Sequence, residues 1–311
     1  MESIPIHPIF AEYDMNKVMR LLSITCLLLT GAISSQAGAT NYSLWINGRG
    51  AGGAAGNYSD FSYWGPPRAD IGVNPKAVNW DGYNSIASQN GKVRNALDCF
   101  CTGTNWCYIA TFSAGDPMMG YTLANFGGST RQVRDAMPKK AGVCGLSGGA
   151  TNTQTGWNIR WVRAAAGAAG GTELSDVGAW TTGEPLVRDL KTATARAMYN
   201  HNDTRGVWFY MYAGARGTAY SFLLPGQDDE VVAYHSSGGV AGSAGSAYCN
   251  PRDWWCNDLT PGAAVNEGGW PKWNNHYLQY RDDAERFKHY LNNNWDGITA
   301  PLRTDMEALA R

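Results

Sequence analysis

The sequence lacks an excess of either charge, a long membrane-spanning run and paired C-x-x-C motifs. Lys and Arg number 25 against 26 Asp and Glu, with no basic stripe, so nucleic acid is not an expected partner. The absence of cysteine knuckles disfavours a structural zinc site. No linker, repeat or low-complexity boundary divides the chain, so one large domain with a substantial buried core is expected.

The segment that starts at Met15 has the parts of a secretory signal peptide. Lys17 and Arg20 form a short basic region, and the uncharged run Leu21–Ile33 follows it. This run is too short for a comfortable permanent span of a bilayer. We therefore expect an export signal and no stable membrane anchor, which indicates a secreted or periplasmic protein.

Small residues at Ala37–Ala39 suit a signal peptidase, so the mature chain is predicted to begin at Thr40. Residues 1–39 are then an extension and a cleaved leader, and residues 40–311 a single catalytic domain. A lipoprotein site at Cys26 is the competing interpretation. That cysteine lies inside the apolar run and lacks the usual small residue before it.

Seven cysteines become six when Cys26 leaves with the leader, and an even count in an exported chain favours disulfides. Cys249 and Cys256 bracket a short loop and are the expected local bridge. The pairing of the other four stays open: Cys99, Cys101, Cys107 and Cys144.

Apolar runs rich in β-branched and aromatic residues alternate with helical stretches. This alternation is typical of an α/β fold in which helices cover both faces of a mainly parallel sheet. The expected strands are Tyr42–Ile46, Trp106–Phe112, Asn158–Gly167, Val207–Gly214 and Ala219–Leu224. The expected helices are Tyr83–Leu97, a segment with Pro117 in its first turn, Glu184–Asn200 and a final Tyr277–Leu291.

Two serines compete for the role of nucleophile. Ser147 lies in a letter-for-letter G-x-S-x-G match, whereas Ser113 has Thr111 in place of the first glycine. A nucleophile elbow needs a strand, a sharp turn and a helix, and Ser113 has that setting. Only about a dozen residues separate Ser147 from the next expected strand, too few for a crossover helix. We therefore assign Ser113 as the nucleophile and Ser147 to a loop.

With these residues the chain resembles the α/β-hydrolase superfamily, especially bacterial lipases and esterases, from Tyr42 to about Leu291. IATFSAGD resembles the nucleophile elbow, and WINGRG resembles the strand and loop that supply part of the oxyanion hole. GGTELSD is similar to the stretch after the next sheet strand, and LPGQDDEVV resembles the loop that carries the acid. The resemblance implies the α/β-hydrolase fold.

The acid loop implies Asp229 as the catalytic acid, because Glu230 and two valines follow it in the expected frame. Asp228 is the alternative. Both aspartates are also compatible with a solvated turn or a calcium-binding carboxylate pair, although no complete calcium ligand set is visible.

His276 is the expected base, because it follows a long irregular loop and directly precedes the expected final helix. The order Ser, Asp, His is also that of the superfamily. His235 follows Asp229 by only six residues and is poorly placed to reach Ser113. His289 is assigned to the exposed or packed face of the final helix, and a structural role for His276 is the competing interpretation.

The expected chemistry is hydrolysis of carboxylic esters through an acyl-enzyme. Backbone amides of Ala114 and Arg49 are expected to form the oxyanion hole. No diffusible cofactor or metal is required, and lipid, soluble and polymeric esters all remain open as substrates. A secreted, non-catalytic binding protein on the same fold is the alternative function, and the sequence does not indicate an oligomeric state.

Overall fold

The computed structural model describes residues of the unit Ala39–Arg311. The described residues are 39–50, 52–65, 71–133, 139–140, 143–144, 152–201, 203–215, 217–220, 223–224, 228–237, 278–280, 284, 286–290 and 297–311. Among them, no helix is long and apolar enough to cross a membrane.

A six-stranded sheet forms the centre of this unit, and every strand pair in it is parallel. The strand order is β10-β9-β8-β3-β1-β2. The strands are β1 (Asn41–Ile46), β2 (Lys76–Val78), β3 (Trp106–Phe112), β8 (Ile159–Ala165), β9 (Phe209–Tyr212) and β10 (Leu278–Tyr280). Two small antiparallel pairs lie outside it: β4 (Thr130–Gln132) with β7 (Thr153–Thr155), and β5 (Lys139–Lys140) with β6 (Val143–Cys144).

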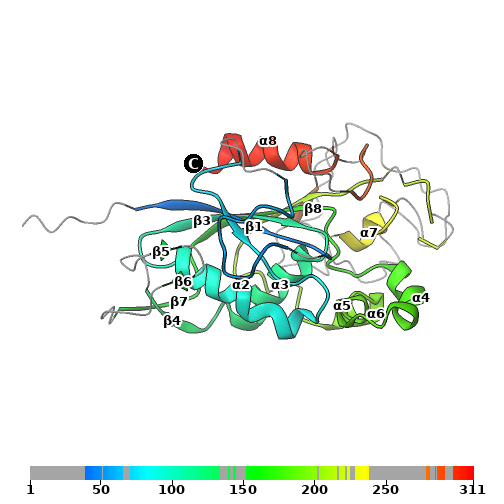
Figure 1. The fold of residues 1–311 in the computed structure, drawn as a ribbon, viewed down its shortest axis with the longest axis horizontal. Coiled ribbons are helices and arrows are strands. Elements are labelled where there is room, and N and C mark those ends of the chain that lie inside the picture. Colours follow the sequence, from blue (N-terminus) through cyan, green and yellow to red (C-terminus); the bar gives the residue numbers. More distant parts are fainter. Residues whose placement is uncertain are drawn as a thin grey trace, which may run out of the picture. The chain divides into compact units, whose positions relative to one another are not determined.

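Helices cover both faces of the sheet (Figure 1). The helices α2 (Ile86–Phe100) and α3 (Gly115–Phe126) lie on one face, and α8 (Thr299–Leu309) contacts β3 and β8 on the other. Successive residues of β1 point to opposite faces, so Leu44 belongs to one buried cluster and Trp45 to the other. The predicted α/β class, with helices on both faces of a parallel sheet, is confirmed.

The helix α2 begins at Ile86 and not at Tyr83, because local hydrogen bonds hold the preceding residues in a turn. The Asp81 carboxylate accepts from the Tyr83 amide at 2.9 Å, and Ser85 Oγ accepts from the Ser88 amide at 3.3 Å. The Asp189 carboxylate, from a distant segment, accepts from the Ile86 amide at 2.7 Å. These acceptors satisfy amide groups that a helix start leaves without intrahelical partners.

The expected helix Glu184–Asn200 is two short helices, α5 (Pro185–Asp189) and α6 (Thr192–Ala197), preceded by α4 (Glu173–Thr182). The chain leaves helical geometry at Lys191, which has ψ 137°. The reason is a contact with α4: the Asp176 carboxylate accepts from the Thr192 amide at 3.0 Å and from its hydroxyl at 2.8 Å. These three helices lie beyond the end toward which the sheet strands point (Figure 1).

Two other expected elements are wrong. In Ala219–Leu224 the described residues form a turn and not a strand, with Tyr220 at φ +62° and the Leu223 amide bonded to the Tyr220 carbonyl at 2.7 Å. The expected helix Tyr277–Leu291 contains the sheet strand β10 and, at residues 286–290, non-helical chain. The last helix is instead α8, and a short helix α7 (Tyr234–Ser237) precedes β10.

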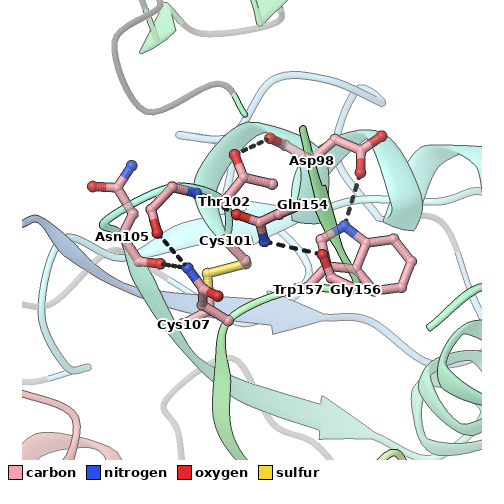
Figure 2. The surroundings of a disulfide bond; sticks show 10 residues. Asp98, Cys101, Thr102, Asn105, Cys107, Gln154, Gly156 and Trp157 are labelled. Atoms are coloured by element: carbon pink, nitrogen blue, oxygen red, sulfur yellow. Dashed lines mark hydrogen bonds between the residues drawn. A yellow bond between two sulfur atoms is a disulfide. The ribbon is translucent and has the colours of Figure 1, made fainter. Parts of the chain in front are cut away.

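A disulfide joins Cys101, at the end of α2, to Cys107, near the start of β3 (Figure 2). The turn between them is held by Asn158, the residue before β8, whose side-chain amide donates to the Gly103 carbonyl at 2.7 Å and to the Asn105 carbonyl at 2.9 Å. Cys99 is also disulfide-bonded. Cys249 and Cys256, the expected local bridge, lie outside the described residues. The Cys101–Cys107 bond therefore joins the end of α2 to β3, the strand that leads to Ser113.

Candidate active site

Ser113 lies in the sharp turn between β3 and α3. Its φ is +52°, in the left-handed region that a residue with a side chain rarely adopts. The turn is held by the Ser113 amide, which donates to the Ala165 carbonyl of β8 at 2.9 Å, and by the Asp116 amide, which donates to the Ser113 carbonyl at 3.0 Å. This geometry is that of a nucleophile elbow at the carboxyl edge of a parallel sheet.

The turn closes because two glycines leave room around Ser113. A Cβ atom at Gly115 would lie 2.6 Å from the Ile46 carbonyl oxygen, and one at Gly48 would lie 2.8 Å from the Ser113 Cβ atom. Thr111, which replaces the first glycine of the motif, is a buried β3 residue. In this elbow the positions that have no room for a Cβ atom are therefore Gly115, which follows the serine in the chain, and Gly48, which faces it from the loop after β1.

The Ser113 side chain contacts a histidine that in turn contacts an aspartate. His289 Nε2 lies 3.1 Å from Ser113 Oγ, and His289 Nδ1 lies 2.8 Å from Asp229 Oδ2. The other carboxylate oxygen of Asp229 accepts from the backbone amides of Val231 at 3.0 Å and Val232 at 2.7 Å. An imidazole that donates its Nδ1–H to a carboxylate presents an unprotonated Nε2 to the hydroxyl, which is the arrangement a general base requires.

Hydrogen bonds join two successive residues of the segment 286–290, Lys288 and His289, to the acid loop. The His289 amide donates to the Asp229 carbonyl at 2.6 Å, and the Lys288 ammonium donates to the Glu230 carboxylate at 2.6 Å. The hydrogen bond from Lys288, with further bonds from Thr218, lowers the pKa of Glu230 to about 2. Two adjacent side-chain pairs therefore join the same two segments.

The structure brings two of the sequence-predicted site residues together, Ser113 and Asp229. Asp228 is buried beside them, but its carboxylate accepts from the Glu230 amide at 2.7 Å, and Asp229 is the residue bonded to His289. His235 lies in the short helix α7.

Ser147 and His276 lie outside the described residues. The assignment of His289 to the face of a helix is wrong, because residues 286–290 are not helical and its side chain lies between Ser113 and Asp229. The order Ser, Asp, His is satisfied by His289 as well as by His276, so this signal alone did not separate them.

The loop after β1 supplies backbone amides next to Ser113. The Gly48 amide donates to the Tyr63 hydroxyl at 3.2 Å, and the Gly50 amide donates to the Gly82 carbonyl at 3.1 Å. Between them, the Arg49 amide has no hydrogen-bond partner among the described residues, and the same holds for the Ala114 amide that follows Ser113. These are the two amides that the sequence predicts as oxyanion donors.

A cavity of about 540 Å³ opens onto Ser113 and His289. Its walls include apolar side chains from the α4–α5 segment and the acid loop, among them Leu174, Val187 and Val231. At one side the Arg49 guanidinium makes two bonds with the Glu184 carboxylate, at 2.8 and 2.7 Å. The cavity can therefore bury an apolar group beside the hydroxyl of the elbow.

A second carboxyl group lies close behind the elbow. Asp116 is in the first turn of α3, and burial raises its pKa to about 8, against a weaker lowering by the Ala169 amide. At neutral pH this carboxyl therefore holds its proton. In the described part of the chain, no group of three or more His, Cys, Asp and Glu side chains could hold a metal ion.

Comparison with known proteins finds similarity in solved structures only. No protein-family description and no curated protein matches the chain. The similar structures include lipase 1 from Pelosinus fermentans, at 12% identity and a TM-score of 0.49 over 88% of this chain and 99% of that one.

Two others are the metagenomic carboxyl esterase MGS0156 and Bacillus licheniformis lipase BlEst2 in its propeptide form. The esterase has 14% identity and a TM-score of 0.41 over 66% of this chain and 62% of its own. The lipase has 11% identity and a TM-score of 0.40 over 65% of this chain, and the match spans less than half of the lipase chain, 44%. The predicted α/β-hydrolase fold is confirmed by the parallel sheet and the elbow of this chain itself.

Proposed function

We propose that this protein is a serine hydrolase that cleaves carboxylic esters, with Ser113 as nucleophile, His289 as base and Asp229 as acid. The observation that carries the proposal is the hydrogen-bonded chain from Ser113 through His289 to Asp229, at an elbow with positive φ. A serine hydroxyl is a weak nucleophile unless such a base lies within hydrogen-bond distance.

In the first half of the reaction, Ser113 Oγ attacks the ester carbonyl carbon while His289 Nε2 takes the hydroxyl proton. The Asp229 carboxylate stabilises the imidazolium and keeps the ring in its orientation. When the tetrahedral intermediate collapses, the carbon–oxygen bond to the alcohol breaks, and His289 gives its proton to the departing alkoxide. In the second half, water attacks the acyl-enzyme by the same steps and releases the acid and the serine.

The oxygen of the tetrahedral intermediate carries a negative charge and needs fixed donors. The Ala114 and Arg49 amides are proposed for this role, and their lack of other partners among the described residues supports it. Loss of one such donor typically costs a factor of roughly 10²–10³ in kcat.

Esters are proposed as substrates, because the cavity beside Ser113 has apolar walls that suit an acyl or alkyl group. We further propose that the protein is exported, with the leader removed before Thr40, as the sequence of the first 39 residues indicates.

Covalent labelling with a fluorescent fluorophosphonate tests for an activated serine before any substrate is known. The parent protein should be labelled stoichiometrically, Ser113→Ala should lose the label, and Ser147→Ala should keep it. Loss of label in Ser147→Ala but not in Ser113→Ala would move the nucleophile to the G-x-S-x-G match. A folded parent protein that takes no label and cleaves no ester would instead support the non-catalytic binding protein.

A further inference from the structure

The loop from Asn47 to Gly50 is held by side chains at each of its peptide groups. Asn47 is fully buried, and its side-chain amide donates to the Gly48 carbonyl at 3.0 Å and to the Trp80 carbonyl at 3.1 Å. Its side-chain oxygen accepts from the Trp80 amide at 3.0 Å. The Asn47 side chain therefore holds the Gly48–Arg49 peptide through its carbonyl oxygen. The nitrogen and the oxygen of that side chain are both held in turn by the backbone of Trp80.

Tyr63 holds the two flanking peptide groups. Its hydroxyl accepts from the Gly48 amide at 3.2 Å and donates to the Arg49 carbonyl at 3.2 Å. Burial raises the pKa of Tyr63, so the hydroxyl keeps the proton that it donates. Its ring packs with Trp64 and Phe112, at centroid distances of 5.5 and 6.4 Å, so the position of the hydroxyl is fixed by the core.

These contacts leave one amide of the loop for a substrate. The Gly48 and Gly50 amides are engaged by Tyr63 and Gly82, whereas the Arg49 amide has no partner among the described residues. Because a trans peptide is planar, its N–H points away from its C=O. With the Gly48 carbonyl held by Asn47, the direction of the Arg49 N–H is set as well.

Such restraint is needed because the backbone is otherwise permissive here. Rotation of the peptide between Gly48 and Arg49 changes ψ of Gly48 and φ of Arg49, and Gly48 has no Cβ to restrict its share of that rotation. A rotated peptide would turn its carbonyl oxygen toward the position of the oxyanion and so replace an attractive donor with a repulsive acceptor.

We propose that Tyr63 is a positioning residue for ester hydrolysis: together with Asn47, its hydroxyl fixes the Gly48–Arg49 peptide so that the Arg49 amide serves the oxyanion. The inference rests on the proposed function of Ser113. Tyr63 acts through the backbone and takes no part in proton transfer. The Tyr63 ring also lines the cavity beside Ser113, but its hydroxyl bonds go to the backbone, so loss of the hydroxyl alone is expected to act on the transition state more than on binding of the ground-state ester.

The test is Tyr63→Phe, which removes both hydroxyl bonds and keeps the ring. The matched control is Tyr108→Phe, because the Tyr108 hydroxyl also donates to a backbone carbonyl, that of Arg311 at 2.6 Å, far from the site. With a p-nitrophenyl ester, Tyr63→Phe should lower kcat by at least about tenfold and leave KM within about threefold. The control should keep the kcat of the parent.

A boronic acid, which forms a tetrahedral adduct on the serine, gives a second readout. Its affinity should fall in Tyr63→Phe by the same factor as kcat/KM, because both report the tetrahedral state. An active parent with unchanged kcat or unchanged boronate affinity in Tyr63→Phe overturns the role of Tyr63 alone. A parent that neither cleaves esters nor reacts with fluorophosphonate overturns the proposed function, and the inference with it.

Discussion

His289 is the residue on which the proposed chemistry depends most, because it contacts both the nucleophile and the acid. His289→Ala should lower ester hydrolysis by several orders of magnitude, about as much as loss of the serine, since members of a triad act as a unit. The measurement is kcat for a soluble ester, with circular dichroism to check folding.

His276→Ala and His235→Ala are the comparison variants for this test, and each should retain most of the activity. The opposite result, activity lost in His276→Ala and kept in His289→Ala, would return the role of base to His276. The contact of His289 with Ser113 would then be structural.

Asp116 should make the stability of the protein depend on pH. Its pKa is raised from 3.8 to about 8 by burial, so between these values the folded chain holds a proton that the unfolded chain has released. Stability then falls as pH rises through this range. Asp116→Asn removes the proton equilibrium, so it should unfold at a higher temperature than the parent near pH 8, and this advantage should shrink near pH 4.

Thermal unfolding of both proteins at the two pH values checks the prediction. An equal difference between Asp116→Asn and the parent near pH 4 and near pH 8 would show that the carboxyl has no unusual proton affinity in the fold.

At the scale of elements, the acid loop and the segment 286–290 are joined by the Glu230–Lys288 pair next to the Asp229–His289 pair. The pKa of Glu230 is lowered from 4.5 to about 2, so the pairing stabilises the fold above pH 4.5, and this contribution is lost as pH falls toward about 2. Glu230→Gln should therefore be less stable than the parent at neutral pH, by less than about 1 kcal/mol because the pair is partly exposed.

Urea unfolding of Glu230→Gln and the parent from neutral pH to about pH 2 measures this difference. We expect the two curves to converge as the carboxylate of the parent is protonated. A difference that stays constant over the whole range would mean that the ion pair contributes nothing and that the substitution acts through packing.

Elements with strong local signals could be predicted from the sequence, and β3 with its elbow is the clearest case. Cys107 to Phe112 are all buried, as in a strand covered on both faces, so the apolar run is continuous and its limits are unambiguous. The contact of Asp229 with His289 agrees with its position in the acid-loop pattern, and the two valines that follow it in that pattern donate their amides to its carboxylate.

Tyr277–Leu291 failed for the opposite reason. Its spacing of apolar and charged residues predicts an amphipathic helix, but β10 forms by pairing with β9, with Leu278 beside Phe209. That partner lies about seventy residues away in the chain, and no local pattern records such pairing. The expected helix placed His289 on a helix face, so this error in secondary structure hid the contact of His289 with Ser113 and Asp229.

At the scale of the whole molecule, the proposed export predicts a processed chain. Mass spectrometry of secreted material should give a first residue at or within about two residues of Thr40. Comparison with and without reductant should show no more than trace free thiol among the six remaining cysteines, which include the bonded Cys101 and Cys107. An intact Met1 or Met15 terminus would refute the leader, and six freely alkylated cysteines would refute the disulfides.

The start of β1 and the last residue of the sequence lie side by side. The Asn41 side-chain amide donates to the Arg311 carbonyl at 3.0 Å, and Asn41 is at the amino end of a parallel sheet whose carboxyl edge carries Ser113. An affinity tag or surface linker added after Arg311 would therefore emerge on the side away from the reaction. Protein fixed to a solid support through that point should therefore keep the cavity beside Ser113 facing the solution and open to large molecules.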